Sequence, residues 1–160
     1  RGRDRLAGKK LVIWQFAARE LSQGSWRSYD YTFKPAEQQG EFYLVPEGEK
    51  RKIKAELVSL SRSPRPGSVP YKDNIVTLHL ENIVDLESGE KLGSALVYAW
   101  GMRDNVLTST ATMRRGEIIS LELADWSDVE DQYSSYRRTT LDDEMIEYEL
   151  PNWGVPIDEK

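Results

Sequence analysis

The sequence offers one histidine as a general base for nucleophilic catalysis, His79. A hydrolytic triad needs a nucleophile, a base and an orienting acid within hydrogen-bond reach, so any triad here would centre on this side chain. His79 stands between Thr77 and Glu81 on the polar side of an alternating segment, which favours a solvated or structurally bonded strand histidine. The sequence contains no cysteine, which excludes thiol catalysis, cysteine-ligated zinc and disulfide bonds. We therefore predict no catalytic residue in this chain.

An acidic run near the C-terminus is the second candidate for chemistry. Asp142, Asp143 and Glu144, with Glu147 and Glu149, could supply oxygen ligands to calcium or paired carboxylates for acid–base work. The run lacks the Asp-x-Asp-x-Asp-Gly pattern of a calcium loop, and acidic runs are usually solvated faces. We predict neither a metal ion nor a cofactor.

Arginines beside aromatic residues are the third candidate, and they suit sugar binding. An aromatic face can pack on the C–H side of a sugar ring, and the rigid fork of arginine suits the carboxylate of a uronic acid. The candidate carbohydrate-binding residues are Arg103, Asp104, Trp126, Tyr133, Tyr136, Arg137 and Arg138. Trp153 is a further surface candidate, whereas Trp100 is expected in the core. The alternative, an arginine–aspartate loop pair that closes the mouth of a barrel, is the commoner use of such residues.

Alternating segments in the second half of the chain must position these side chains. Apolar residues recur at every second position in four segments, a period typical of half-buried strands: 53–57, 76–80, 119–123 and 146–150. The segment 95–100 is apolar on both faces, which indicates a central strand covered on both sides. The turn at 87–90 predicts a hairpin, residues 61–73 predict a long irregular loop, and Ser127 is expected to cap a helical turn over 127–132.

Five such strands predict a mostly-β fold, a small five-stranded antiparallel barrel of the OB type. A β-sandwich of the jelly-roll kind is the alternative, although it needs more strands than the sequence shows. The strand expected at 10–16 and the helix expected after it predict the C-terminal remnant of an α/β domain over residues 1–24. Residues 25–50 form an aromatic connector with a candidate interface, and residues 51–160 form the β module. The candidate interface residues are Trp26, Tyr29, Tyr31 and Phe33.

Charge is unevenly distributed around a net value of −5. The C-terminal third is strongly acidic and would repel phosphate backbones, so we expect no nucleic-acid partner. Lys50, Arg51, Lys52 and Lys54 could attract a polyanion, although a lysine-rich strand start more often protects a sheet edge. No run approaches the length of a membrane span.

Two stretches resemble proteins related to alginate O-acetyltransferase, which are SGNH hydrolase-like bacterial exopolysaccharide proteins. Residues 12–26, Val-Ile-Trp-Gln-Phe-Ala-Ala-Arg-Glu-Leu-Ser-Gln-Gly-Ser-Trp, are similar to the end of their SGNH domain. Residues 100–108, 123–130 and 141–144 are similar to the β extension that follows it in some relatives. The family's Gly-Asp-Ser-like turn and Asp-x-His pair do not occur in this chain.

The resemblance implies a periplasmic location and a non-catalytic accessory module that binds or positions an anionic exopolysaccharide such as alginate. The parent protein would be an SGNH-type O-acetyltransferase or esterase. A structural module that packs on the upstream SGNH-like domain or on a subunit of a secretion complex is the alternative. Single-stranded nucleic-acid binding is the third hypothesis, because OB-type barrels often have this role.

Overall fold

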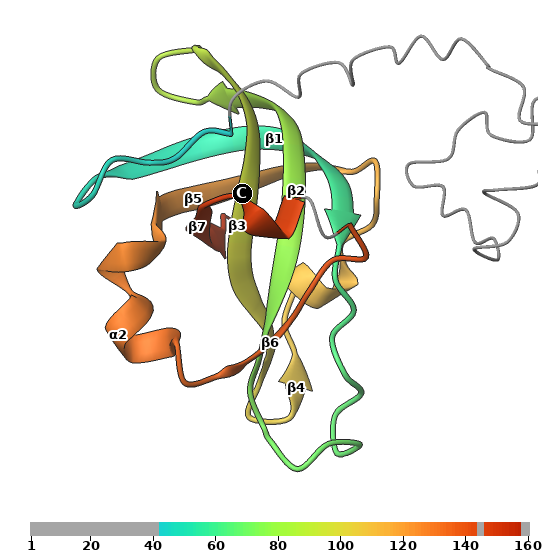
Figure 1. The fold of residues 1–160 in the computed structure, drawn as a ribbon. Helices are drawn as coiled ribbons and strands as arrows, with labels where there is room; N and C mark the ends of the chain where they lie inside the picture. The colour runs from blue at the N-terminus through green and yellow to red at the C-terminus, as the bar shows by residue number, and fades with distance from the viewer. Residues whose placement is uncertain (1–41, 144–145, 158–160) are drawn as a thin grey trace, which may run out of the picture. The chain divides into compact units, whose positions relative to one another are not determined.

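The computed structural model describes residues 42–143 and 146–157, and this part of the chain contains seven strands and a few short helices (Figure 1). The strands are β1 (Lys50–Leu60), β2 (Asn74–Asp85), β3 (Lys91–Arg103), β4 (Val106–Leu107), β5 (Ile118–Asp125), β6 (Arg137–Thr139) and β7 (Pro151–Pro156). The short helices are η1 (Thr110–Thr112), η2 (Trp126–Asp128), α2 (Glu130–Tyr133) and η3 (Ile146–Tyr148). No helix in the described ranges is long and apolar enough to cross a membrane.

Five of the strands close into a barrel, in the order β1, β2, β3, β7, β5 and back to β1. The predicted small five-stranded barrel and the mostly-β class are therefore confirmed. The pairing between β3 and β7 is parallel and the other four are antiparallel, so the barrel is mixed rather than purely antiparallel. The short strands β4 and β6 extend the sheet beside β3 and β2.

Side chains along each strand alternate between the inside and the outside of the barrel, and the inward-facing ones are aliphatic. We call this group of side chains the inner cluster. Its members are Val45, Ile53, Ala55, Leu57, Val76, Leu78, Leu80, Ile83, Ala95, Val97, Ala99, Ile119, Leu121 and Leu123. The predicted apolar positions of 53–57, 76–80 and 119–123 all lie in this cluster. The segment 95–100 is covered on both sides as predicted, because Leu96, Tyr98 and Trp100 pack in a second cluster on the other face of β3.

The fifth barrel strand is not the one that the sequence predicts. Residues 146–148 form η3, and the strand is β7, which begins at Pro151. Tyr148 and Leu150 are 82% and 69% exposed, so the expected apolar face of 146–150 does not exist. The inward-facing positions of β7 include Gly154, where a Cβ would lie 2.5 Å from Val97 Cγ1. Only glycine allows this close approach, and the apolar alternation is therefore missing from the true strand.

The segment that enters β1 is held against the barrel by Asn152. The side-chain oxygen of this fully buried residue accepts the Val45 N–H at 2.8 Å, and its Nδ2 donates to the Tyr43 carbonyl at 2.9 Å. Phe42 forms a bridge with Ser94 at the start of β3. Residues 42–45 therefore belong to the packed structure of the barrel.

The connections largely follow the sequence. The turn between β2 and β3 forms the predicted hairpin, and residues 61–73 are irregular. The expected helical turn occurs as η2 and α2, but its cap is Asp125, whose carboxylate accepts the Ser127 N–H at 2.7 Å. The predictions for residues 1–41, which include the strand at 10–16 and the interface residues Trp26, Tyr29, Tyr31 and Phe33, lie outside the described residues.

The basic start of β1 is not at a sheet edge. This strand lies between β5 and β2, so its lysines do not protect an edge as expected. Lys50 forms an ion pair with Glu122 at 3.0 Å, and Arg51 pairs with Glu49 at 2.7 Å. Part of this positive charge is therefore neutralised by neighbouring carboxylates.

Candidate functional site

The outer face of β3 supports a group of six rings that we call the outer aromatic cluster. The rings belong to Tyr98, Trp100, Trp126, Tyr133, Tyr136 and Trp153. Tyr98 and Trp100 project from β3, and Trp153 projects from β7, which pairs with β3 at Tyr98. The segment 126–136, which contains η2 and α2, supplies the other three rings.

The rings pack mainly edge to face around Trp100. Its ring lies 5.0 Å from Tyr136, 5.1 Å from Tyr133 and 5.6 Å from Trp153, with interplanar angles of 73–89°. This geometry suits the ring quadrupole, in which the positive edge of one ring faces the negative face of another. The cluster is thus a small second core on the outside of the barrel, and most of its ring faces are occupied.

The segment 126–136 is tied to the barrel at its start. The Asp128 carboxylate accepts the Gly48 N–H, with both oxygens at 3.1 Å, and Asp125 caps η2. Trp126 then packs on Tyr98 at 5.1 Å and on Trp153 at 5.9 Å. Local capping and aromatic packing together place α2 over the outer face of β3.

Two arginines from distant parts of the sequence lie on the rings of β3. The Arg103 guanidinium lies 4.0 Å from the Trp100 ring centroid and 5.9 Å from that of Tyr136. The Arg138 guanidinium lies 4.2 Å from the Tyr98 ring centroid. Since Tyr98 and Trp100 are two residues apart on one strand, their ring attachments are about 7 Å apart. The arrangement presents two stiffened cations on one face of the barrel.

Buried polar side chains hold β6, and with it Arg138, against β2. Thr77 Oγ1 donates to the Thr139 carbonyl at 2.9 Å, and the Ser61 hydroxyl lies 3.0 Å from the Thr139 hydroxyl. Asn74 Nδ2 donates to the Arg137 carbonyl at 3.1 Å. Asn74, Thr77 and Ser61 are all buried, so these hydrogen bonds satisfy groups that could not otherwise contact water.

Arg103 is held by the tight turn between β3 and β4. Asp104 and Asn105 both have positive φ, 48° and 62°, as the two central residues of a type I′ hairpin require. The Asp73 carboxylate accepts the Asp104 N–H at 2.9 Å and lies 3.5 Å from Arg103 Nε. Asp73 therefore fixes both the turn and the direction of the Arg103 side chain.

The structure brings together most of the residues that the sequence predicts for this site. Arg103, Trp126, Tyr133, Tyr136 and Arg138 all contact the outer aromatic cluster. In contrast, Arg137 is exposed and has no ring contact among the described residues. Asp104 belongs to the turn through its backbone N–H.

Sequence reasoning missed Tyr98 and Asp73, and it misplaced one tryptophan. Trp153, expected at the surface, is 5% exposed in the outer aromatic cluster. Trp100, expected in the core, is half-buried and packs in the same cluster. The available signal was the alternation of large rings at 98 and 100 on a strand predicted to be covered on both faces.

His79 is buried rather than solvated, at 2% exposure. Its ring stacks on Phe42 at 5.5 Å between centroids, and its Nε2 lies 3.7 Å from Glu81 Oε1. The prediction allowed a solvated or a structurally bonded strand histidine, and the solvated alternative does not hold, because Phe42 of the entering segment packs on the ring.

Burial raises the pKa of the Tyr98 hydroxyl above its ordinary value. The Arg138 guanidinium above the ring opposes this rise in pKa, and Glu147 adds to it. Glu147 Oε1 also accepts the Leu141 N–H at 2.7 Å. No group of three or more acidic or histidine side chains that could hold a metal ion occurs in the described ranges.

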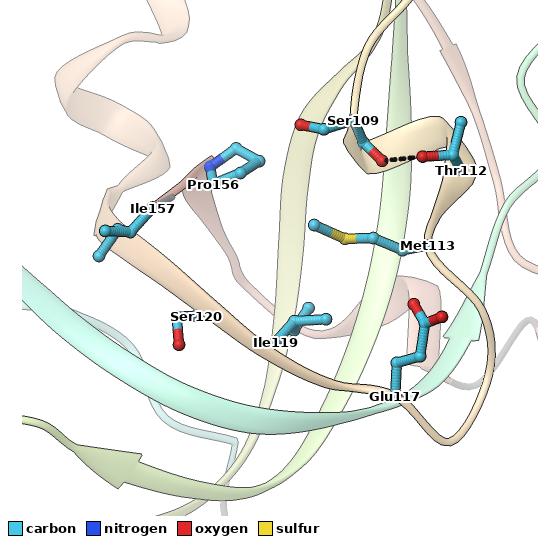
Figure 2. Close-up of a pocket in the computed structure, with 8 residues that line it drawn as sticks. All are labelled: Ser109, Thr112, Met113, Glu117, Ile119, Ser120, Pro156 and Ile157. Carbon is cyan, nitrogen blue, oxygen red and sulfur yellow. Dashed lines mark hydrogen bonds between the residues drawn. The ribbon is translucent and has the colours of Figure 1, made fainter. Parts of the chain in front are cut away.

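A shallow pocket of about 340 Å³ lies apart from the predicted site residues (Figure 2). Its lining residues are Ser109, Thr112, Met113, Glu117, Ile119, Ser120, Pro156 and Ile157. Two of its polar groups have local roles: Thr112 Oγ1 donates to the Ser109 carbonyl at 2.7 Å, and the Glu117 carboxylate accepts the Arg114 N–H at 2.8 Å. The polar groups of the pocket thus include internal turn contacts, and we assign it no chemistry.

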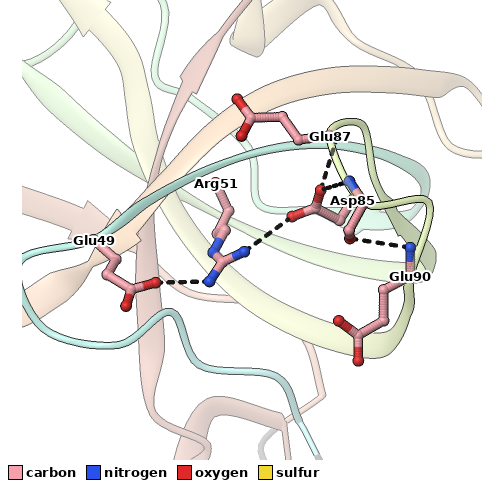
Figure 3. A network of polar contacts seen from close by, with 6 residues as sticks. Glu49, Arg51, Asp85, Glu87 and Glu90 are labelled. Atoms are coloured by element: carbon pink, nitrogen blue, oxygen red, sulfur yellow. Dashed lines mark hydrogen bonds and ion pairs between the residues drawn. The ribbon is translucent and has the colours of Figure 1, made fainter.

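A charged network closes the end of the barrel near the β2–β3 turn (Figure 3). The Asp85 carboxylate accepts the N–H groups of Ser88 and Glu87, both at 2.8 Å, and these bonds hold its pKa below the ordinary value. Arg51 lies between Glu49 and Asp85, and its hydrogen bond to Glu49 raises the pKa of the guanidinium. The network stabilises a hairpin turn and is separate from the outer face of β3.

The candidate site is therefore a face of the barrel on which arginines are fixed by aromatic packing. Its exposed polar groups include the guanidinium groups of Arg103 and Arg138. Such an arrangement can bind an anion. Comparison with known proteins adds no family to this description: no family model, no curated protein and no solved structure matches the chain.

Proposed function

We propose that this β barrel is a non-catalytic accessory module that binds or positions an anionic polysaccharide, such as alginate, for an O-acetyltransferase-like parent protein. The stacking of Arg103 on Trp100 and of Arg138 on Tyr98 is the observation that supports this proposal most directly. Stacking on a ring restricts a guanidinium before a ligand arrives, so less conformational freedom is lost when it binds a carboxylate.

The chemistry of the face favours carboxylates over neutral sugars. The faces of Trp100 and Tyr98 that could stack on a sugar ring are partly covered by guanidinium groups. Recognition would therefore rely on the charged forks of the arginines, which match a carboxylate in bidentate geometry. A chain of uronic acids offers such groups at regular intervals.

Isothermal titration of the full chain with uronate oligomers tests the proposal. We expect binding to uronate oligomers and none to a neutral oligosaccharide of the same length. The double variant R103Q/R138Q should abolish binding while the protein stays folded. The matched control K52Q/K91Q removes two exposed positive charges near the opposite end of the barrel and should bind like the wild type. Absence of wild-type binding, or equal loss in both variants, would refute the proposal.

A structural role is the second candidate, and two exposed apolar side chains favour it. Tyr148 and Leu150 are neighbours in sequence and largely exposed, which is typical of a surface that meets another protein. We would then expect the variant Y148S/L150S to lose binding to the upstream domain supplied as a separate chain, with uronate binding unchanged. Unchanged association in pull-down and sedimentation measurements would exclude this role.

A further inference from the structure

The arginine face continues onto a positively charged end of the barrel, where the loop 61–73 adds three further cations. The loop 61–73, the β3–β4 turn and the start of β6 meet at this end, opposite the β2–β3 turn (Figure 1). We call these segments, residues 61–73, 103–105 and 137–138, the basic end. They contain six arginines and lysines, all exposed, and two aspartates, within a chain whose net charge is −5. The six are Arg62, Arg65, Lys72, Arg103, Arg137 and Arg138.

Hydrogen bonds connect each new cation to an element of the candidate site. Lys72 is joined to the β3–β4 turn, because its carbonyl accepts the Asn105 N–H at 2.9 Å. The tip of the loop meets the same turn, where Asn105 Oδ1 accepts the Gly67 N–H at 3.4 Å. Arg62 follows Ser61, whose hydroxyl lies 3.0 Å from that of Thr139, the neighbour of Arg138. The loop therefore borders both site arginines.

The loop is stiff enough to present its charges in a defined place. Residues 65–68, Arg-Pro-Gly-Ser, close a turn in which the Ser68 N–H donates to the Arg65 carbonyl at 3.0 Å. Proline and then glycine at the two central positions, with a φ of 74° at the glycine, are typical of a type II turn. Pro64 and Pro70 restrict the chain on either side. A preorganised loop loses little freedom when a ligand binds.

We propose that the loop 61–73 of the basic end is a second binding segment, in which Arg62, Arg65 and Lys72 bind the continuation of a carboxylated polysaccharide chain. This inference rests on the proposed function, in which the chain first engages Arg103 and Arg138. The cations extend from Arg103 and Arg138 on the outer face of β3 to the loop 61–73. This arrangement suits an extended polyanion, because each added carboxylate meets a further cation. Short ligands would engage the face alone.

The surroundings favour a carboxylated chain over a nucleic acid. Single-stranded nucleic acids are bound by stacking bases on aromatic faces, whereas the rings here pack against one another or under arginines.

The test compares a uronate dimer with a long uronate oligomer on three proteins: the wild type, R62Q/R65Q/K72Q and R103Q/R138Q. The triple variant should lose about tenfold in affinity for the long oligomer, as expected for three exposed ion pairs, and its salt dependence should be shallower. Its affinity for the dimer should be unchanged. The double variant should bind neither the dimer nor the long oligomer. The control K50Q/K52Q/K91Q should bind both ligands like the wild type.

The outcomes separate this inference from the proposed function. If the wild type binds neither ligand, both proposals fail. If the wild type binds both and the triple variant equals it on the long oligomer, the second segment is refuted and the proposed function stands. Loss of the dimer in the triple variant, with circular dichroism unchanged, would also refute a separate segment. Tighter binding of a single-stranded oligonucleotide at physiological salt would overturn the ligand class.

Discussion

The inner cluster and the outer aromatic cluster share the strand β3 but differ in composition and in cover. The inner cluster is aliphatic, is enclosed by five strands and is almost wholly buried. The outer one is aromatic and is covered by one loop segment and by arginines at its margin. The inner cluster therefore stabilises the fold only. The outer aromatic cluster also holds charged side chains at the surface, where they are accessible to a ligand. Alternation of side chains lets one strand serve both.

The largest effect is expected inside the barrel. Leu121→Ala removes a fully buried side chain between close-packed neighbours and should lower the free energy of unfolding by about 2–5 kcal/mol. Urea unfolding followed by circular dichroism measures this change. Leu150→Ala, at an exposed leucine, should change it by less than about 0.5 kcal/mol. Similar losses in the two variants would contradict the enclosed inner cluster.

The next effect concerns the buried amide at the end of the barrel. Asn152→Ala leaves the buried Val45 N–H without its acceptor and the half-buried Tyr43 carbonyl without its donor, so the free energy of unfolding should fall by about 1–3 kcal/mol. Amide hydrogen exchange at Val45 should also become faster. An unchanged exchange rate would show that residues 42–45 are held by other contacts.

Changes in the outer aromatic cluster should be smaller than those in the inner one. Trp100→Leu removes three ring contacts but leaves the barrel interior intact, so we expect a loss of about 1–3 kcal/mol. Tryptophan fluorescence should then report an earlier transition than far-ultraviolet circular dichroism, because the outer cluster loosens first. Coincident transitions would mean that the two clusters unfold as one unit.

The arginine on Tyr98 should matter little for stability. Arg138→Gln removes an exposed cation–π contact, which contributes about 0.5–1 kcal/mol. Arg137→Gln, at a neighbouring exposed arginine without a ring contact, is the matched control and should leave the free energy of unfolding unchanged. If both substitutions lowered the free energy of unfolding equally, the cause would be the loss of a positive charge and not the loss of stacking on Tyr98.

The smallest effect should appear only at alkaline pH. Because the pKa of Tyr98 is raised by burial, the unfolded chain releases this proton first as the pH rises above 10. The contribution of Tyr98 to stability is therefore complete below pH 10 and is lost as the pH rises through the folded-state pKa. Tyr98→Phe should be less sensitive to this rise than the wild type in urea unfolding at neutral and alkaline pH. Parallel pH profiles would contradict a buried hydroxyl.

Much of the barrel could be predicted because its strands follow a simple rule. Segments 53–57, 76–80 and 119–123 alternate apolar and polar residues, and the apolar positions all face inward. The fifth strand could not be predicted in this way. Its inward-facing residue Gly154 is selected by close contact with Val97 rather than by hydrophobicity, and Pro151 and Pro156 at its ends resemble loop residues.

The candidate site could be predicted in part. The aromatic and arginine residues of 133–138 were visible as a sequence cluster, and the structure places Tyr133, Tyr136 and Arg138 together. The contact of Arg138 with Tyr98 and the role of Asp73 were not visible, since these residues come from other strands and loops. Contacts between residues so far apart in sequence leave no periodic signal.

Residue pattern alone thus decides that this chain forms a small, mostly-β barrel with an aliphatic interior, because burial of alternating side chains is a local property of each strand. Tertiary structure alone decides that Arg103 and Arg138 share one face, and that the loop 61–73 borders it. The pairing of β6 with β2 and of β2 with β3 brings these segments together. Such long-range pairing depends on the shapes of side chains that meet only after the chain has folded.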